Sequence, residues 1–125
     1  RLGRTVRLAR TVSWELPFPA AAFDAVVCQR TLYAMDPEAA VRLLKEMRRV
    51  LAPGGRIAFN LPNFEHPDHA ARLAAGLTPW PSPTRPRYWT PGMLRALLPR
   101  LGLRILSLRQ GAWLDAVVSR APRRA

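Results

Sequence analysis

The spacing of hydrophobic residues in the first half of the chain predicts a strand followed by a helix. The apolar run Ala25–Cys28 lacks polar alternation, which is typical of a strand buried on both faces. Apolar residues then recur at intervals of three and four over Pro37–Ala52, and polar residues such as Glu46 and Arg49 fall mostly on the other face. This pattern predicts a helix over that range, capped by Asp36.

A turn at Pro53–Gly55 ends this predicted helix, and the mainly apolar segment Arg56–Leu61 follows as a strand. A strand, a helix and a strand in this order form a unit in which the two strands are parallel and the crossover is right-handed. We therefore expect an α/β fold in which Val26–Cys28 and Ile57–Leu61 are adjacent parallel strands.

The last third of the chain contains a second clear helix. Thr90 is positioned to cap it, Pro91 suits its first position, and Gly102 follows its end. The apolar face of this helix consists of Met93, Leu94, Leu97, Leu98 and Leu101.

Three more segments have the pattern of strands. Residues 5–14 alternate loosely between apolar and polar and predict a short strand. Leu103–Leu108 and Trp113–Ser119 predict an antiparallel pair, and we expect the last strand to lie next to Ile57–Leu61. The basic tail from Arg120 is expected to fray.

The middle of the chain, residues 62–89, is rich in proline and predicts a loop or lid with a short helix over Asp68–Ala75. Trp80, Tyr88 and Trp89 would either contact an acceptor substrate or pack over the last helix.

A polar cluster also lies in this segment: Glu65, His66, Asp68 and His69. The close spacing of the two histidines around Pro67 gives poor metal-ligand geometry. We therefore expect a solvated loop and no metal site.

The chain of 125 residues, 49% of them hydrophobic, is long enough for one domain with one core. Cys28 is the single cysteine, which excludes an internal disulfide framework and a cysteine-rich zinc site. No apolar run approaches the roughly 18–20 residues of a membrane span, and no signal peptide opens the sequence. We therefore expect a cytoplasmic protein without membrane contacts.

The formal net charge of +12 would favour contact with phosphate backbones or anionic surfaces. Lys45 is the only lysine among the 20 basic residues, and the arginines are spread along the whole chain. This distribution indicates genomic composition more than a nucleic-acid interface, which usually clusters its charge with aromatic residues. A nucleic-acid partner is thus an alternative that we do not favour.

Several segments, in their order and spacing, resemble the second half of a class I S-adenosylmethionine-dependent methyltransferase. The resemblance is to the large bacterial small-molecule group often called type 11. The segments that carry it are Leu16–Pro19, Phe23–Gln29, Leu32, Asp36–Pro37, Glu46–Arg56, Arg87–Pro91 and Leu101–Leu103.

The resemblance implies a partial Rossmann-like methyltransferase sheet, mostly parallel with an antiparallel last strand. We expect the C-terminal portion of a single methyltransferase domain, because the N-terminal strands and the Gly-rich loop are missing. Its parts would be a remnant strand and cofactor-side loop (1–22), a strand–helix–strand core (23–61), a Pro/aromatic lid or loop (62–89), a helix with the final strand pair (90–119) and a basic tail (120–125).

The resemblance also implies S-adenosylmethionine as the cofactor. The family binds it through a Gly-rich loop and an acidic residue at the end of the second strand, but the seven glycines of this chain form no G-x-G pattern. Val12 stands where the family has an acidic residue that contacts the adenine. We expect the chain, which begins at Arg1, to be a fragment that scarcely binds the cofactor alone.

The family's positions map onto a small set of candidate residues. The cofactor-binding candidates are Ser13, Trp14, Glu15, Leu16, Cys28, Gln29 and Arg30. The substrate candidates are Tyr33, Trp80, Tyr88 and Trp89. No catalytic residue is assigned, because alignment of donor and acceptor would carry much of the rate.

The resulting prediction is methyl transfer to a small-molecule acceptor by the intact protein. The alternatives are a basic RNA-binding or RNA-methylating half-domain and a non-catalytic remnant. Because a partial sheet leaves an edge and a face uncovered, we also expect self-association.

Overall fold

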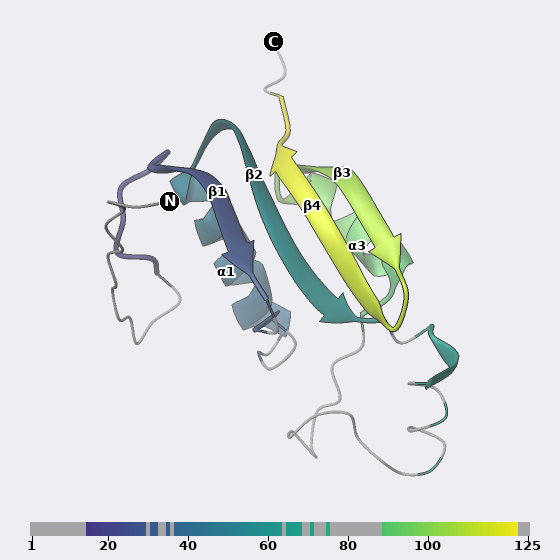
Figure 1. The fold of residues 1–125 in the computed structure, drawn as a ribbon. Coiled ribbons are helices and arrows are strands. Elements are labelled where there is room, and N and C mark those ends of the chain that lie inside the picture. Colours follow the sequence, from purple (N-terminus) through teal and green to yellow (C-terminus); the bar gives the residue numbers. More distant parts are fainter. Residues whose placement is uncertain are drawn as a thin grey trace, which may run out of the picture.

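The computed structural model describes residues 15–29, 31, 32, 35, 37–63, 65–68, 71, 75 and 89–122. Its principal elements in chain order are β1 (Phe23–Cys28), α1 (Pro37–Val50), β2 (Leu51–Pro62), α3 (Pro91–Arg100), β3 (Leu103–Gln110) and β4 (Trp113–Arg120). The four strands form one sheet in the order β1-β2-β4-β3 (Figure 1).

The pairing of the strands confirms the expected topology. β1 and β2 are parallel, with Val26 opposite Ile57, and α1 connects them. β4 lies between β2 and β3 and is antiparallel to both, so Val118 has Ile57 on one side and Ile105 on the other. Since β3 and β2 both oppose β4, the strands β1, β2 and β3 run in the same direction among the four described strands, and the sheet is mostly parallel with an antiparallel last strand, as predicted.

Helix α1 ends at Val50, two residues before the predicted end at Ala52. Leu51 is fully buried and already pairs with Phe23 at the start of β1. Burial of this leucine in the sheet, which helical spacing alone does not reveal, therefore decides where the helix stops.

The turn after Leu51 depends on two glycines in different ways. Gly54 has a φ of +82°, a conformation that residues with a Cβ rarely adopt. Gly55 is needed for space, because a Cβ atom there would lie 2.8 Å from the carbonyl oxygen of Asp24. Together they let β2 approach β1 closely at its first residues.

Both α1 and α3 lie on the same side of the sheet, behind the strands in Figure 1. The hydrophobic core fills the space between these helices and the sheet. It includes Leu44 and Met47 of α1, Ile57, Phe59 and Leu61 of β2, Leu94 and Leu98 of α3, and Leu114 and Val118 of β4. None of the helices in the described ranges has the length and apolarity that a membrane crossing requires.

The opposite face of the sheet carries a row of cross-strand neighbours that no helix of the described ranges covers. Val27 pairs with Ala58, and Ala58 pairs with Val117. The side chain of Val27 is 68% exposed, and Leu106 of β3 is 40% exposed. This is the face through which we expect the chain to self-associate, and that expectation stays a prediction.

Helix α3 begins as predicted, since the Oγ1 atom of Thr90 accepts a hydrogen bond from the Met93 amide at 3.2 Å. Its buried stripe is narrower than predicted. Leu94 and Leu98 are fully buried, but Met93 is 47% exposed. Because α3 meets the sheet through positions four residues apart, Met93 faces away from the core.

Arg120 and Ala121, where the sequence predicted that the tail frays, are held by hydrogen bonds. The Nη1 atom of Arg120 donates to the carbonyl oxygen of Leu51 at 3.0 Å, and the Ala121 amide donates to the carbonyl oxygen of Gly102 at 2.8 Å.

The predicted strand over residues 5–14 and most of the predicted lid lie outside the described residues. Within the predicted short helix, the Ala75 amide donates to the Ala71 carbonyl oxygen at 3.0 Å.

Candidate functional site

The carboxyl end of β1 is the candidate site that the fold presents. Ligands of open α/β sheets bind at the carboxyl ends of the parallel strands. Cys28 is the last residue of β1 and pairs with Phe59, and Gln29 follows it in an exposed position. The hydroxyl of Thr31 donates to the carbonyl oxygen of Gln29 at 3.0 Å, which shapes this turn. The structure therefore places Cys28 and Gln29 together at the edge where the sequence predicted them.

The Cys28 thiol is partly buried against the core. This burial raises the pKa of Cys28 above its ordinary value, and a hydrogen bond with Thr31 partly opposes the shift. Because the charged form is disfavoured, the thiol stays protonated near neutral pH and is a poor nucleophile. Cys28 is thus suited to line the candidate site rather than to act as a nucleophile.

Asn63, just after β2, is a buried polar residue that sequence reasoning missed; it is only 6% exposed. Its Nδ2 atom donates to the carbonyl oxygen of Gly111 at 3.0 Å, and its backbone amide donates to that of Ala112 at 2.9 Å. Its Oδ1 atom accepts from the Glu65 amide at 3.0 Å. These bonds tie the carboxyl end of β2 to the turn between β3 and β4, so Asn63 shapes this edge of the sheet.

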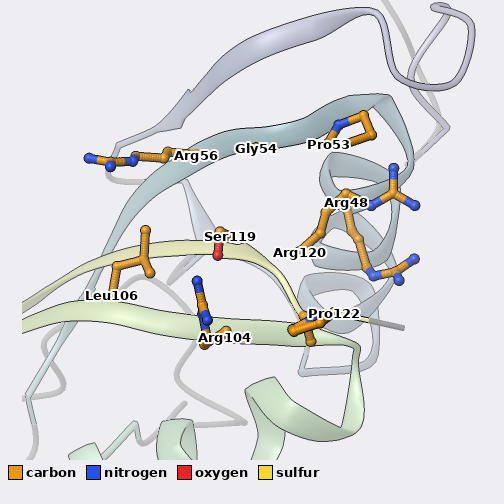
Figure 2. A pocket seen from close by; sticks show the side chains of 10 residues that line it. Arg48, Pro53, Gly54, Arg56, Arg104, Leu106, Ser119, Arg120 and Pro122 are labelled. Atoms are coloured by element: carbon orange, nitrogen blue, oxygen red, sulfur yellow. The ribbon is translucent and has the colours of Figure 1, made fainter. Parts of the chain in front are cut away.

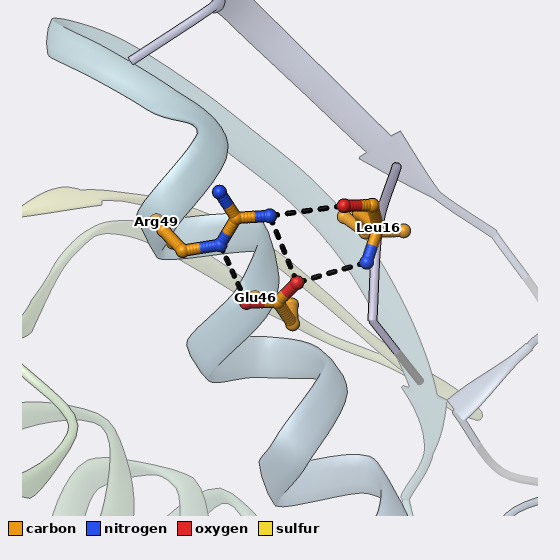
Figure 3. A network of polar contacts seen from close by, with 3 residues as sticks. All are labelled: Leu16, Glu46 and Arg49. Atoms are coloured by element: carbon orange, nitrogen blue, oxygen red, sulfur yellow. Dashed lines mark hydrogen bonds and ion pairs between the residues drawn. The ribbon is translucent and has the colours of Figure 1, made fainter. Parts of the chain in front are cut away.

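Leu16, another predicted cofactor residue, is held by a polar network on α1 (Figure 3). Its amide donates to Oε1 of Glu46 at 2.8 Å, and its carbonyl oxygen accepts from Nη2 of Arg49 at 3.0 Å. Arg49 also pairs with Glu46, with 2.7 Å between Nε and Oε2. The polar contacts of Leu16 are therefore with α1 and its own loop, and none reaches the Cys28–Gln29 turn.

Glu46 and Arg49 belong to the polar residues that the sequence pattern placed mostly opposite the apolar face of α1. The hydrogen bonds from the Arg49 guanidinium, and next the one from the Leu16 amide, hold the pKa of Glu46 below its ordinary value. The contact joins residues 30 positions apart, and helical periodicity carries no information about it. The only signal in the sequence is an acidic and a basic residue three positions apart on one helix.

The Glu46 network predicts how stability depends on pH. A carboxyl group whose pKa is lower in the folded state stabilises the fold above its unfolded pKa and loses that effect as the pH falls through the folded pKa. We expect Glu46→Gln to lower the unfolding midpoint slightly at pH 7, and the difference from wild type to shrink as the pH falls through the lowered pKa of Glu46. Thermal unfolding followed by circular dichroism over a series of acidic pH values measures this.

The matched control is Glu38→Gln, which removes the same charge from an exposed position in the first turn of α1. An equal loss of stability in both variants, or a loss in Glu46→Gln that does not shrink at all toward acidic pH, would contradict a specific role of the Glu46 network.

Trp89, a predicted substrate residue, is part of the hydrophobic core and only 4% exposed. It borders a mainly apolar groove of about 570 Å³ between α1 and α3, lined by Val41 and Lys45 on one side and Leu97 on the other. Its Nε1 atom is buried, and no residue in the described part of the chain accepts a hydrogen bond from it. Of the two roles predicted for Trp89, packing in the core agrees with its position in this structure, and contact with an acceptor substrate stays a prediction.

The remaining candidates divide between exposed positions and undescribed ones. Glu15 is exposed, next to Leu16. His66 and Asp68 lie close, with the Asp68 amide donating to Nδ1 of His66 at 3.2 Å, and the described residues contain no group of three potential metal ligands. The candidates outside the described residues are Ser13, Trp14, Arg30, Tyr33, Trp80 and Tyr88.

Comparison with known families gives one match. Residues 3–59 match the family described as a methyltransferase domain. No curated protein matches the chain.

Solved structures share the fold over most of the chain. A Methanosarcina mazei protein described as a SAM-dependent methyltransferase is 19% identical and has a TM-score of 0.68; the match covers 88% of this chain and 65% of the Methanosarcina chain. The PH0226 protein of Pyrococcus horikoshii is 18% identical and has a TM-score of 0.66; the match covers 86% of this chain and 56% of the Pyrococcus chain.

A third similar structure is a Burkholderia thailandensis 1,6-didemethyltoxoflavin-N1-methyltransferase with bound S-adenosylhomocysteine. It is 18% identical, with a TM-score of 0.63 and coverage of 87% of this chain and 48% of its own. The chain thus spans about half to two thirds of the length of these neighbours. At this level of identity, the likeness establishes the fold.

Proposed function

We propose that this chain, whose residues 3–59 match the methyltransferase domain family, supplies the second half of a class I S-adenosylmethionine-dependent methyltransferase domain that methylates a small-molecule acceptor. The observation that carries the proposal is the sheet itself. The parallel unit β1–α1–β2 is followed by an antiparallel β4 inserted between β2 and β3, as the family resemblance predicted. The match of residues 3–59 to the methyltransferase domain family supports the same assignment.

The proposed cofactor site lies at the carboxyl end of β1. The exposed amide of Gln29 and the backbone of the Cys28–Arg30 turn would hold the methionine part of S-adenosylmethionine, and the Ser13–Leu16 backbone would lie beside the adenine. The protonated Cys28 thiol fits this place, because a thiolate would compete with the acceptor for an electrophilic methyl group. The cofactor, when bound, supplies that methyl group on a positively charged sulfur.

The proposed contribution of this chain to catalysis is alignment. Holding two reactants in line at about 3–3.5 Å replaces a bimolecular encounter with an intramolecular one. The bonds from Asn63 fix the end of β2 against the β3–β4 turn, and this rigidity would keep the edge in place. Tyr33, Trp80, Tyr88 and Trp89 are the proposed contacts for the acceptor.

The proposal can be tested with a chimera. The part of the Methanosarcina mazei neighbour that precedes the region matched by this chain would be fused ahead of residue 3 of this chain. We expect the chimera to bind S-adenosylmethionine with a dissociation constant in the micromolar range by calorimetry. Gln29→Ala in the chimera should weaken binding about tenfold. Gln110→Ala should leave the affinity unchanged, because Gln110 ends β3, the edge strand on the other side of the sheet from β1.

Circular dichroism and thermal unfolding must first show that the chimera and both variants fold. A folded chimera without measurable binding would overturn the proposed cofactor site. Equal affinities for the Gln29→Ala and Gln110→Ala variants would remove Gln29 from it.

A further inference from the structure

Four arginines surround a pocket at the amino end of β2, which we call the arginine pocket (Figure 2). They are Arg48 of α1, Arg56 of β2, Arg104 of β3 and Arg120 of β4. The pocket has a volume of about 570 Å³. Since β1 and β2 are parallel, it lies at the end of the sheet opposite Cys28 and Gln29, and it is separate from the proposed cofactor site.

No carboxylate of the described residues balances the charge of the arginine pocket. None of the ten described residues that line it is acidic. Within the described ranges, the ion pairs join Arg49 to Glu46 and His66 to Asp68, which lie elsewhere. Four positive groups of like charge repel one another at short range, and an anion among them would remove that repulsion.

Two of the four arginines are held in place by the backbone. The Nε atom of Arg48 donates to the carbonyl oxygen of Gly102 at 3.0 Å, and Nη1 of Arg120 donates to that of Leu51 at 3.0 Å. A guanidinium has five N–H donors, so each keeps donors for a ligand. Side chains already held in place lose less conformational freedom when a ligand binds.

Ser119 gives the arginine pocket an unsatisfied polar group. The residue is only 7% exposed, lines the pocket, and its Oγ atom has no hydrogen-bond partner among the described residues. Arg104 is its cross-strand partner on β3, and the register of β2 with β4 brings Arg56 beside it on the other side. Figure 2 shows the Arg104 side chain directed toward Ser119. A buried hydroxyl without a partner is unfavourable, and a ligand oxygen would satisfy it.

We propose that the arginine pocket binds a small molecule that carries a diphosphate group. Phosphate oxygens accept hydrogen bonds from arginine forks and from a serine hydroxyl, and guanidinium groups bind them more strongly than neutral donors do. The guanidinium groups are spread around the pocket rather than gathered at one point (Figure 2). A ligand with two linked anionic groups matches this spread better than a single phosphate does.

The test uses inorganic pyrophosphate as the probe and the full chain as the protein. We expect pyrophosphate to raise the unfolding midpoint at constant ionic strength, and calorimetry to show stronger binding than for inorganic phosphate. Arg104→Gln should lower the affinity by at least about tenfold, because it removes a charged donor. The matched control, Arg42→Gln, removes the same charge from an exposed position on α1 and should change the affinity less than about twofold.

Ser119 provides a second, independent measurement. We expect Ser119→Ala to lower pyrophosphate affinity several-fold, while the unfolding midpoint without ligand stays unchanged or rises, because the unsatisfied hydroxyl is gone. Ser119→Thr, which keeps the hydroxyl and suits a strand, should retain binding.

Three results would overturn the proposal. The first is an absence of pyrophosphate binding by the folded chain. The second is an equal loss of affinity in Arg104→Gln and Arg42→Gln, which would indicate general charge attraction. The third is a tighter complex with single-stranded RNA that pyrophosphate displaces and Arg104→Gln weakens, which would assign the pocket to a phosphodiester chain. None of these measurements involves S-adenosylmethionine, so they are independent of the proposed function.

Discussion

The isolated chain should show no S-adenosylmethionine binding by calorimetry at cofactor concentrations of about 100 μM. The family resemblance implies two anchors that the sequence does not contain, a Gly-rich loop and an acidic residue on the ribose. Each hydrogen bond to a charged acceptor contributes roughly 1.5–3 kcal/mol. The absence of two or three such bonds removes about 3–9 kcal/mol, and every 1.4 kcal/mol corresponds to about a tenfold change in affinity. A site with a dissociation constant of about 10 μM would therefore weaken to roughly 1 mM or beyond.

The chimera described above is the positive control, because it restores these anchors. Methyl transfer should likewise be undetectable with the isolated chain. A clear micromolar isotherm from the purified chain would contradict the prediction and would mean that another segment, or a second copy, supplies the donors. Sedimentation during the same titration would distinguish these two explanations.

Phe59→Ala should lower the free energy of unfolding by about 3–5 kcal/mol. Phe59 is only 1% exposed, and it lies in the middle of β2 with Cys28 on one side and Ala116 on the other. Its ring is part of the hydrophobic core, so truncation removes apolar contact and leaves a cavity beside the middle of β2. Urea denaturation followed by circular dichroism measures the change.

The control for this prediction is Val27→Ala on β1, whose side chain is 68% exposed. It should change the free energy of unfolding by less than about 0.5 kcal/mol. Because natural domains are only marginally stable, a Phe59→Ala chain that is unfolded without denaturant would agree with the prediction. A loss smaller than about 1 kcal/mol would mean that the core near β2 collapses around the missing ring.

The order and type of the elements could be predicted from the sequence because each depends on residues close together in the chain. The apolar spacing of α1, the Thr90 cap and the short apolar strand Ala25–Cys28 are local signals, and the structure confirms the elements they predicted. Because the two strands of a strand–helix–strand unit are parallel, these local signals also predicted that β1 and β2 pair in parallel. The position of Cys28 and Gln29 at a carboxyl edge follows from the same rule.

The tertiary structure alone decided what depends on contacts between distant residues. Helix α1 stops at Val50 because Leu51 pairs with β1, although helical spacing extends further. Arginines scattered along the sequence meet Ser119 in one pocket because β4 is inserted between β2 and β3, which sets the ends of three strands side by side. Glu46 similarly accepts the hydrogen bond from the Leu16 amide only when the loop at Leu16 folds back against α1. Local periodicity determines which face of an element is apolar, whereas strand order and register determine which polar side chains on the other faces come together.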